Sequence, residues 1–227
     1  MRDFVLFAVF PYVACILAVL AGIYRYRHDR FSYSSFSSQF LENRRLFWGS
    51  VSWHYGILII LSAHVLAALF PRFWARLIAA PLQLYVLEVT GLALGVLVIV
   101  GLALLILRRL LNPRILVVTS AMDWVLLFVL FVQVLLGFWV ALFYRWGADW
   151  YLYTVVPWLT SLVKLKPRIE YVAVLPWIVK AHILCGFLII TLFPFTRLVH
   201  VVTVPFSYLW RPFQVVIWNR RLPRREA

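Results

Sequence analysis

The sequence predicts an all-α integral membrane protein with five transmembrane helices. Its mean hydropathy is +0.94, and 65% of its 227 residues are hydrophobic while only 13% are charged. Water-soluble domains of this size are far less apolar. A helix needs about 20 apolar residues to cross the hydrocarbon of a bilayer. Five runs reach that length, at residues 4–24, 48–70, 82–107, 122–144 and 172–199.

The first span, residues 4–24, sets the expected orientation. Its apolar core is too long for a cleavable signal peptide, and its positive charges follow the core instead of preceding it. We therefore expect the amino terminus outside. In that topology 14 of the 22 Lys and Arg residues lie in inner segments, as the positive-inside rule requires. The tail at residues 201–227 is then cytoplasmic.

No linker or repeat divides the chain, so residues 1–227 are interpreted as one membrane domain. The net charge of +14 is explained by contacts with anionic lipid headgroups and does not indicate nucleic acid. Cys15 and Cys185 both lie within spans, so no disulfide framework is indicated.

The second span, residues 48–70, contains His54 and His64. An imidazole is unfavourable in hydrocarbon unless it has a partner, so an intramembrane histidine indicates a functional site. Ten residues of helix rise about 15 Å. We therefore expect His54 near the inner side of the membrane and His64 near the outer side.

The third span, residues 82–107, carries Glu88 about 9 Å inside the outer boundary. A carboxylate at this depth must be neutral, paired or in a wet pocket. Its depth matches that of His64, which predicts a role in proton handling near that histidine. A hydrogen bond to a neighbouring helix is the alternative.

The fourth span, residues 122–144, begins with Asp123 in its first turn, where the helix dipole favours negative charge. Asp123 is predicted to be a helix cap or a partner for an inner arginine. Gln133 and Gly137 at mid-span indicate helix packing. The apolar piece at residues 151–163 is too short to span and contains a proline, so we expect it in the outer interface.

The fifth span, residues 172–199, brings His182 near its outer end and His200 at its inner end. Eighteen residues are five whole helical turns, so one continuous helix would point both side chains the same way. This span runs antiparallel to the second one. His64 is therefore expected to face His182, and His54 to face His200.

Each histidine pair leaves room for one flat ring whose iron is bound from both faces. Two b-type haems in a helix bundle fit this pattern, because histidine is a common axial ligand. Zinc fits less well, since no Cys, Asp or Glu completes a tetrahedron at either level. Lys180 and Arg197 lie close in sequence to His182 and His200 and are predicted to pair with haem propionates.

At these residues the chain resembles a known family, the gamma subunit of membrane-bound respiratory nitrate reductase, a dihaem cytochrome b. The matching features are SSQ at residues 37–39, the spacing of His54 and His64, the R-x8-D of Arg114 to Asp123, and LFPFTRLVH-x4-P ending at Pro205. The resemblance covers nearly the whole chain.

The resemblance implies a multi-pass protein of the prokaryotic cell membrane that oxidises quinol near an outer haem. Electrons would pass through both haems to an iron–sulfur beta subunit on the cytoplasmic face, and then to a molybdenum-containing alpha subunit that reduces nitrate. His64 and His182 would bind the distal haem, and His54 and His200 the proximal one. The tail at residues 201–227 would dock the beta subunit.

The quinol site departs from the family pattern. The family has a lysine four residues after the proline that opens the third span, and this chain has Tyr85 there. We therefore predict a quinol pocket in which Tyr85 donates a hydrogen bond and Glu88 accepts a proton.

Three other functions remain open from the sequence. The first is a dihaem anchor for a heterodisulfide- or sulfite-type reductase. The second is a proton-coupled transporter that uses intramembrane His and Glu, and it predicts no haem. The third is a purely structural anchor, in which the histidines would serve no electron transfer.

Overall fold

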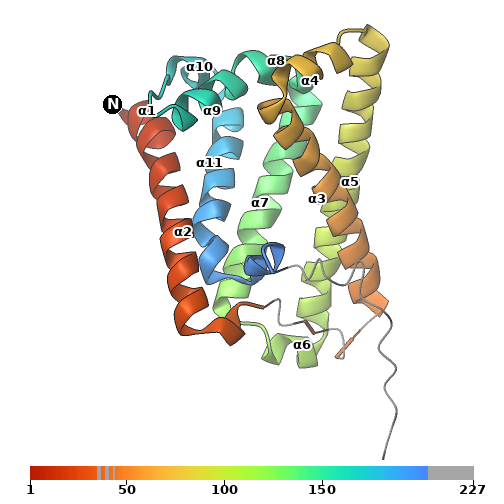
Figure 1. The fold of residues 1–227 in the computed structure, drawn as a ribbon. Coiled ribbons are helices and arrows are strands. Elements are labelled where there is room, and N and C mark those ends of the chain that lie inside the picture. Colours follow the sequence, from red (N-terminus) through yellow and green to blue (C-terminus); the bar gives the residue numbers. More distant parts are fainter. Residues whose placement is uncertain (35–36, 39–40, 43, 204–227) are drawn as a thin grey trace, which may run out of the picture.

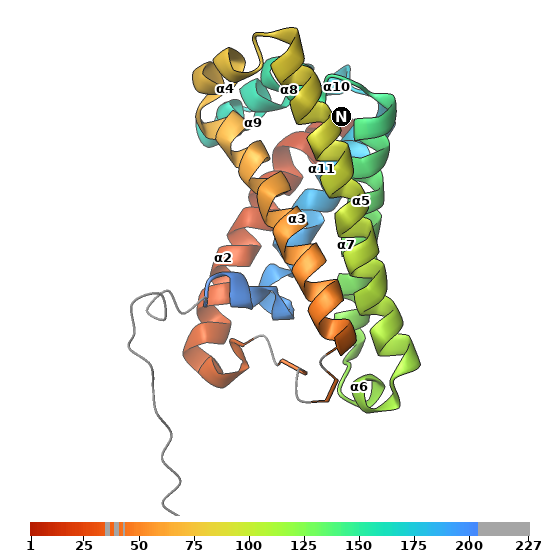
Figure 2. The same cartoon turned by 90° about the vertical axis from the view of Figure 1, so that its right-hand side faces the viewer.

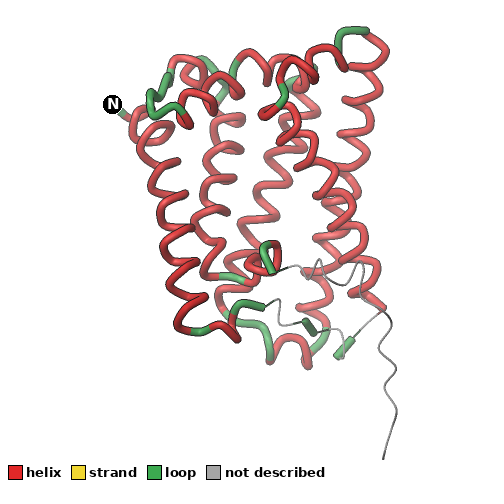
Figure 3. Tube along the Cα trace, viewed as in Figure 1, coloured by secondary structure: helices red, strands yellow, loops and turns green. Residues whose placement is uncertain are grey.

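The structure is a computed structural model and describes residues 1–34, 37–38, 41–42 and 44–203. The described residues form helices joined by short loops (Figures 1 and 3). Five of these helices are long and apolar enough to cross a membrane, which confirms the predicted number of spans. They cover Arg2–His28, Arg44–Leu69, Pro81–Leu111, Ala121–Phe143 and Trp177–Phe195. The chain is therefore a multi-pass membrane protein.

The first span is built from α1 (Arg2–Phe4), a π-helical turn η1 (Val5–Val9) and α2 (Phe10–His28). Pro11 has no backbone N–H, so the carbonyl of Phe7 lacks its usual α-helical donor. The indole of Trp158 supplies one, with Nε1 donating to Phe7 O at 2.9 Å. A proline in the span is thus compensated by a side chain from a distant helix.

The other spans are α3 (Arg44–Leu69), α5 (Pro81–Leu111), α7 (Ala121–Phe143) and α11 (Trp177–Leu192). In the part of the chain that is described, α3 packs mainly against α5, α5 against α7, α7 against α11, and α11 against α2. The spans therefore form an arc with α3 at one end, and α3 shares no comparable contact with α11. Figure 1 shows α11 and α7 between α2 and α3, and Figure 2 shows α3 crossing beside α5.

Glycines bring α3 and α5 into close contact. A β-carbon on Gly101 of α5 would lie 2.6 Å from the backbone nitrogen of Trp53 on α3. Gly95 likewise lies against Phe138 of α7, where a β-carbon would be 3.0 Å from a ring carbon. Gly91 differs, since a β-carbon there would meet no atom within 4 Å.

A buried ion pair fixes the start of α3 against α5. Arg108, only 2% exposed, donates from Nε to Glu42 Oε2 at 2.7 Å and also bonds the backbone carbonyls of Ser38 and Glu42. Glu42 in turn accepts the N–H groups of Arg45 and Leu46 in the first turn of α3. One carboxylate therefore caps α3 and ties it to the neighbouring span.

The capping layer, defined as α4 (Pro71–Leu77), α8 (Gly147–Tyr153), α9 (Val155–Val163) and α10 (Glu170–Ala173), covers the end of the bundle that carries the amino terminus (Figure 1). The predicted interfacial piece is thus two short helices, α8 and α9. The opposite end, called the α6 end, carries α6 (Pro113–Val117) and the 3-10 turns η2 (Arg30–Ser32), η3 (Phe193–Phe195) and η4 (Arg197–Val201).

The prediction of one continuous helix over residues 172–199 is wrong. Pro176 precedes α11, and Pro194 lies in η3, where it cannot continue an α-helical hydrogen-bond ladder. Thr196 then adopts extended backbone, with φ −121° and ψ −178°, before η4 begins. Arg25 of α2 donates to the carbonyls of Pro194 at 2.7 Å and Thr196 at 3.1 Å, which satisfies the backbone groups that the break exposes.

Candidate functional site

The α6 end brings His54 of α3 and His200 of η4 together. Their ring centres are 6.1 Å apart and their planes cross at 71°. Metal–imidazole bonds are about 2 Å long, and the ring centre lies roughly 1 Å behind the bonding nitrogen, so two imidazoles on opposite sides of one metal ion have ring centres roughly 6 Å apart. The observed separation matches that arrangement.

Backbone carbonyls fix the tautomer of this pair. Nδ1 of His54 lies 2.7 Å from Ser50 O, and Nδ1 of His200 lies 2.6 Å from Arg197 O. A carbonyl oxygen can only accept, so Nδ1 carries the proton in each ring. The lone pair is then on Nε2, the nitrogen that remains for a metal ion.

The second pair is His64 of α3 and His182 of α11, nearer the capping layer. Nδ1 of His64 bonds Ile60 O at 2.8 Å, and Nδ1 of His182 bonds Gln133 O at 3.2 Å. Gln133 and Gly137 do more than pack helices, because Gln133 accepts from the His182 ring and Gly137 leaves room for it.

His28 shows that the Nδ1 hydrogen bond alone does not mark a ligand. Its Nδ1 also bonds a carbonyl, that of Tyr24 at 2.9 Å, and its ring stacks on the Tyr24 ring with centres 4.0 Å apart. All five histidines of the chain are described, and His28 faces none of the others. What distinguishes His54 and His200 from His28 is that their rings face each other.

His54 and His64 are exposed although they lie in a membrane span. An imidazole that faced lipid would be unfavourable, so a space shared with another polar or metal-binding group is favoured. His54 has His200 of η4 across that space, and His64 has the ring of Tyr151 of α8 beside it. The facing rings of His54 and His200 and their Nδ1 hydrogen bonds fit a haem group held by histidine on both faces.

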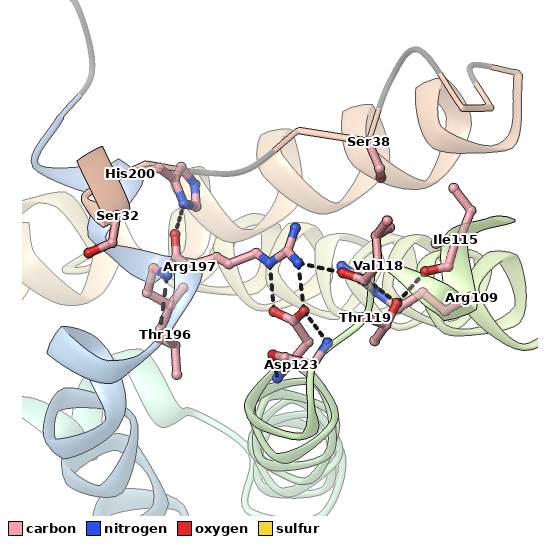
Figure 4. A network of polar contacts seen from close by, with 12 residues as sticks. Ser32, Ser38, Arg109, Ile115, Val118, Thr119, Asp123, Thr196, Arg197 and His200 are labelled. Carbon is pink, nitrogen blue, oxygen red and sulfur yellow. Dashed lines mark hydrogen bonds and ion pairs between the residues drawn. The ribbon is translucent and has the colours of Figure 1, made fainter. Parts of the chain in front are cut away.

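The ring of His200 is oriented by an ion pair between α7 and η4 (Figure 4). Arg197 Nε lies 2.7 Å from Asp123 Oδ1, and a second guanidinium nitrogen lies 2.7 Å from Oδ2. The carbonyl of the same arginine receives the His200 Nδ1–H. Asp123 also forms a capping box with Ser120, so both predicted roles of Asp123, cap and arginine partner, are confirmed.

Arg197 and Lys180, which were predicted to pair with haem propionates, each form an ion pair with an aspartate of the protein. Arg197 pairs with Asp123, while Lys180 Nζ lies 3.3 Å from Asp3 Oδ2 and 2.7 Å from Ala173 O. A propionate would have to share these cations with the two aspartates.

The two residues predicted for quinol lie on α5 below the capping layer. Glu88 Oε1 accepts the backbone N–H of Ala148 at 2.9 Å, in the first turn of α8. The hydrogen bond to a neighbouring helix, weighed as an alternative from the sequence, is therefore present. Tyr85 is 57% exposed on the same helix.

Tyr151 of α8 was missed by the sequence reasoning. Its ring packs edge-on against the ring of His64, with centres 5.7 Å apart and planes at 75°. Local sequence gives no signal for this contact, because it depends on how α8 folds back over α3. Its place in an apolar interfacial segment was the only available indication.

Comparisons with known proteins agree with these features. The family model described as nitrate reductase gamma subunit matches residues 3–219. The nitrate reductase gamma chain of Bacillus subtilis is 33% identical over 221 residues, which are 96% of this chain and 98% of that one. The respiratory nitrate reductase 2 gamma chain of Escherichia coli is 32% identical over 92% of this chain and 93% of that one. The chain therefore belongs to the nitrate reductase gamma subunit family.

Proposed function

We propose that this chain is the membrane-anchoring cytochrome b subunit of a respiratory nitrate reductase. In this role it takes electrons from membrane quinol and passes them to partner subunits. The observation that carries the proposal is that the rings of His54 and His200 face each other with centres 6.1 Å apart, the separation expected of two ligands on one metal ion. Membership of the gamma subunit family supports the choice of complex.

His64 and His182 would hold the distal haem, and His54 and His200 the proximal one. The haems, when bound, supply two one-electron carriers at two depths in the membrane. The chain holds the Nδ1 of each ligand at a backbone carbonyl, so Nε2 is the nitrogen left to bind iron. Such second-shell bonds orient a ligand ring and tune its basicity.

The amino terminus would lie outside and the carboxyl terminus in the cytoplasm. Charge distribution supports this orientation, since the segments predicted to be inside hold 14 of the 22 basic residues. An iron–sulfur beta subunit and a molybdenum-containing alpha subunit would then bind at the α6 end. The tail predicted to dock the beta subunit, residues 201–227, lies outside the described residues beyond 203.

Quinol would be oxidised beside His64, with Tyr85 as hydrogen-bond donor and Glu88 as proton acceptor. Glu88 uses Oε1 to hold α8, and in the described part of the chain its Oε2 makes no hydrogen bond. One oxygen of the carboxylate therefore remains for a proton. Propionate contacts of Lys180 and Arg197 stay predictions.

The experiment is a reduced-minus-oxidised spectrum of the purified complex with the haem-to-protein ratio. We expect b-type bands and two haems per chain, with His54→Ala and His64→Ala each removing one haem and leaving the other. His28→Ala is the matched control, because that histidine makes the same Nδ1 bond without a facing ring, and it should retain both haems. A complex without b-type bands would overturn the proposal.

A further inference from the structure

Helix α8 is held firmly above the second histidine pair. Both backbone groups of Ala148 are bonded by side chains from other helices: its N–H by Glu88 of α5 at 2.9 Å, and its C=O by the Trp74 indole of α4 at 3.1 Å. Trp150 Nε1 also donates to Tyr144 O at 3.1 Å. Helix α8 has only seven residues, so these three hydrogen bonds fix its position. The position of Tyr151, which follows Trp150 in α8, is therefore fixed as well.

Tyr151 makes contact with the ring and the backbone of His64. The ring centres are 5.7 Å apart in an edge-to-face arrangement, and the phenol oxygen lies 3.5 Å from His64 O. The oxygen contact is at the limit of a hydrogen bond and therefore weak. Edge-to-face packing of two rings is favourable at this separation. The ring of Tyr151 therefore restrains the His64 imidazole more than the hydroxyl of Tyr151 does.

The environment of Tyr151 keeps its ring in place. The side chain packs against two buried clusters, one around Trp158 and one around Trp74. Packing on both clusters restricts the motion of the Tyr151 ring beside His64.

The orientation of the His64 ring depends on Tyr151, because the hydrogen bond of His64 Nδ1 comes from its own helix. Its Nδ1 bond to Ile60 O comes from the preceding turn of its own helix. His182, by contrast, is bonded to Gln133 O on a neighbouring helix. A contact from a second element is thus supplied to His182 by α7 and to His64 by α8.

We propose that Tyr151 is a positioning residue that fixes the imidazole plane of His64 and covers that end of the outer haem site from the membrane surface. The inference rests on the proposed function, in which His64 and His182 hold a haem. Ligand orientation and solvent exposure are two of the means by which a protein sets the properties of a haem. Water stabilises the more positively charged oxidised iron, so uncovering the site lowers its reduction potential.

The test uses the whole complex in membranes, with three substitutions at Tyr151 and one control. Tyr151→Ala removes the ring, Tyr151→Leu keeps apolar volume without a flat ring, and Tyr151→Phe keeps the ring without the hydroxyl. Tyr153→Ala is the matched control, since Tyr153 is on the same helix, is 65% exposed and does not contact His64. Electron paramagnetic resonance of the oxidised complex reports ligand planes, and a redox titration reports potentials.

We expect Tyr151→Ala, which uncovers the site, to lower the potential of the outer haem. Both Tyr151→Ala and Tyr151→Leu, which lack the flat ring, should shift its largest g-value, while the inner haem is unchanged. Phe and the Tyr153 control should match the unsubstituted complex. An unchanged outer haem in Tyr151→Leu, or a shift in Tyr151→Phe as large as in Tyr151→Ala, overturns the inference. Failure of the proposed function is distinguishable, because the unsubstituted complex would then contain no b-type haem. The inner-haem signal of each variant shows that the protein has assembled.

Discussion

The ring of His182 lies so close to Gly137 of α7 that a β-carbon on the glycine would be 2.7 Å from Cε1 and 3.3 Å from Nε2 of that ring. No ordinary contact is that short, so a larger residue at this position would displace the imidazole. The helix that orients His182 through Gln133 O thus also makes room for it one turn later.

Gly137→Ala is therefore expected to remove or strongly perturb the outer haem and to leave the inner one in place. The measurement is the haem-to-protein ratio together with the low-temperature spectrum. Gly91→Ala is the matched control, because a β-carbon there meets no atom within 4 Å. Alanine is also favoured over glycine within a helix by about 0.5–1 kcal/mol. Two full haems in Gly137→Ala would contradict the role of the glycine.

Asp123→Asn is expected to disturb the inner haem. The substitution removes the charge from a buried ion pair, and breaking such a pair typically costs about 3–5 kcal/mol. It leaves Arg197 without its carboxylate, and the carbonyl of Arg197 orients His200. The inner-haem band should weaken and thermal unfolding in detergent should begin at a lower temperature. Asp149→Asn, at a position without an ion pair among the described residues, should change neither measurement.

The lowered pKa of Glu42 predicts that the stability of the protein depends on pH. Desolvation raises the pKa of this carboxyl, but hydrogen bonds from two backbone N–H groups and from the Arg108 guanidinium outweigh it, so the pKa lies below its usual value. A carboxyl with a lowered folded-state pKa contributes stability above its unfolded pKa of about 4.3 and loses it as the pH falls further.

Glu42→Gln should accordingly lower the free energy of unfolding at pH 7 and flatten its decline below about pH 4.3. Tryptophan fluorescence during unfolding in detergent, measured at several pH values, provides the comparison. Equal pH profiles for the two proteins would show that the ion pair with Arg108 contributes nothing to the acid sensitivity.

Glu88→Gln separates the two roles of that carboxylate. The amide oxygen of glutamine can still accept the Ala148 N–H, so the position of α8 should be kept. Glutamine cannot accept a proton, and general base catalysis is typically worth 100-fold or more. We expect haem reduction by quinol to slow by about 100-fold while chemical reduction by dithionite is unchanged. A normal quinol rate would remove Glu88 from the proton path.

The number of spans could be predicted from sequence, because the hydropathy of each apolar run is a local property. The contact of His54 with His200 could also be predicted, because the two histidines lie at matching ends of antiparallel spans. The five apolar runs gave five spans, and His54 does lie beside His200. The reasoning behind that pair was partly wrong, because it assumed one continuous helix from His182 to His200 and the helix ends before Pro194. Tyr151 could not be predicted, because its contact with His64 is fixed by α4 and α5 through Ala148.

The extended backbone at Thr196 separates His200 from the helix that carries His182. The spacing of 18 residues between these histidines is therefore not a structural repeat, and it need not follow helical periodicity. A residue inserted in this chain between Phe193 and Arg197 would leave the direction of the His182 side chain unchanged, because α11 ends at Leu192. The same insertion within α11, before His182, would rotate His182 by about 100° relative to the preceding part of the helix.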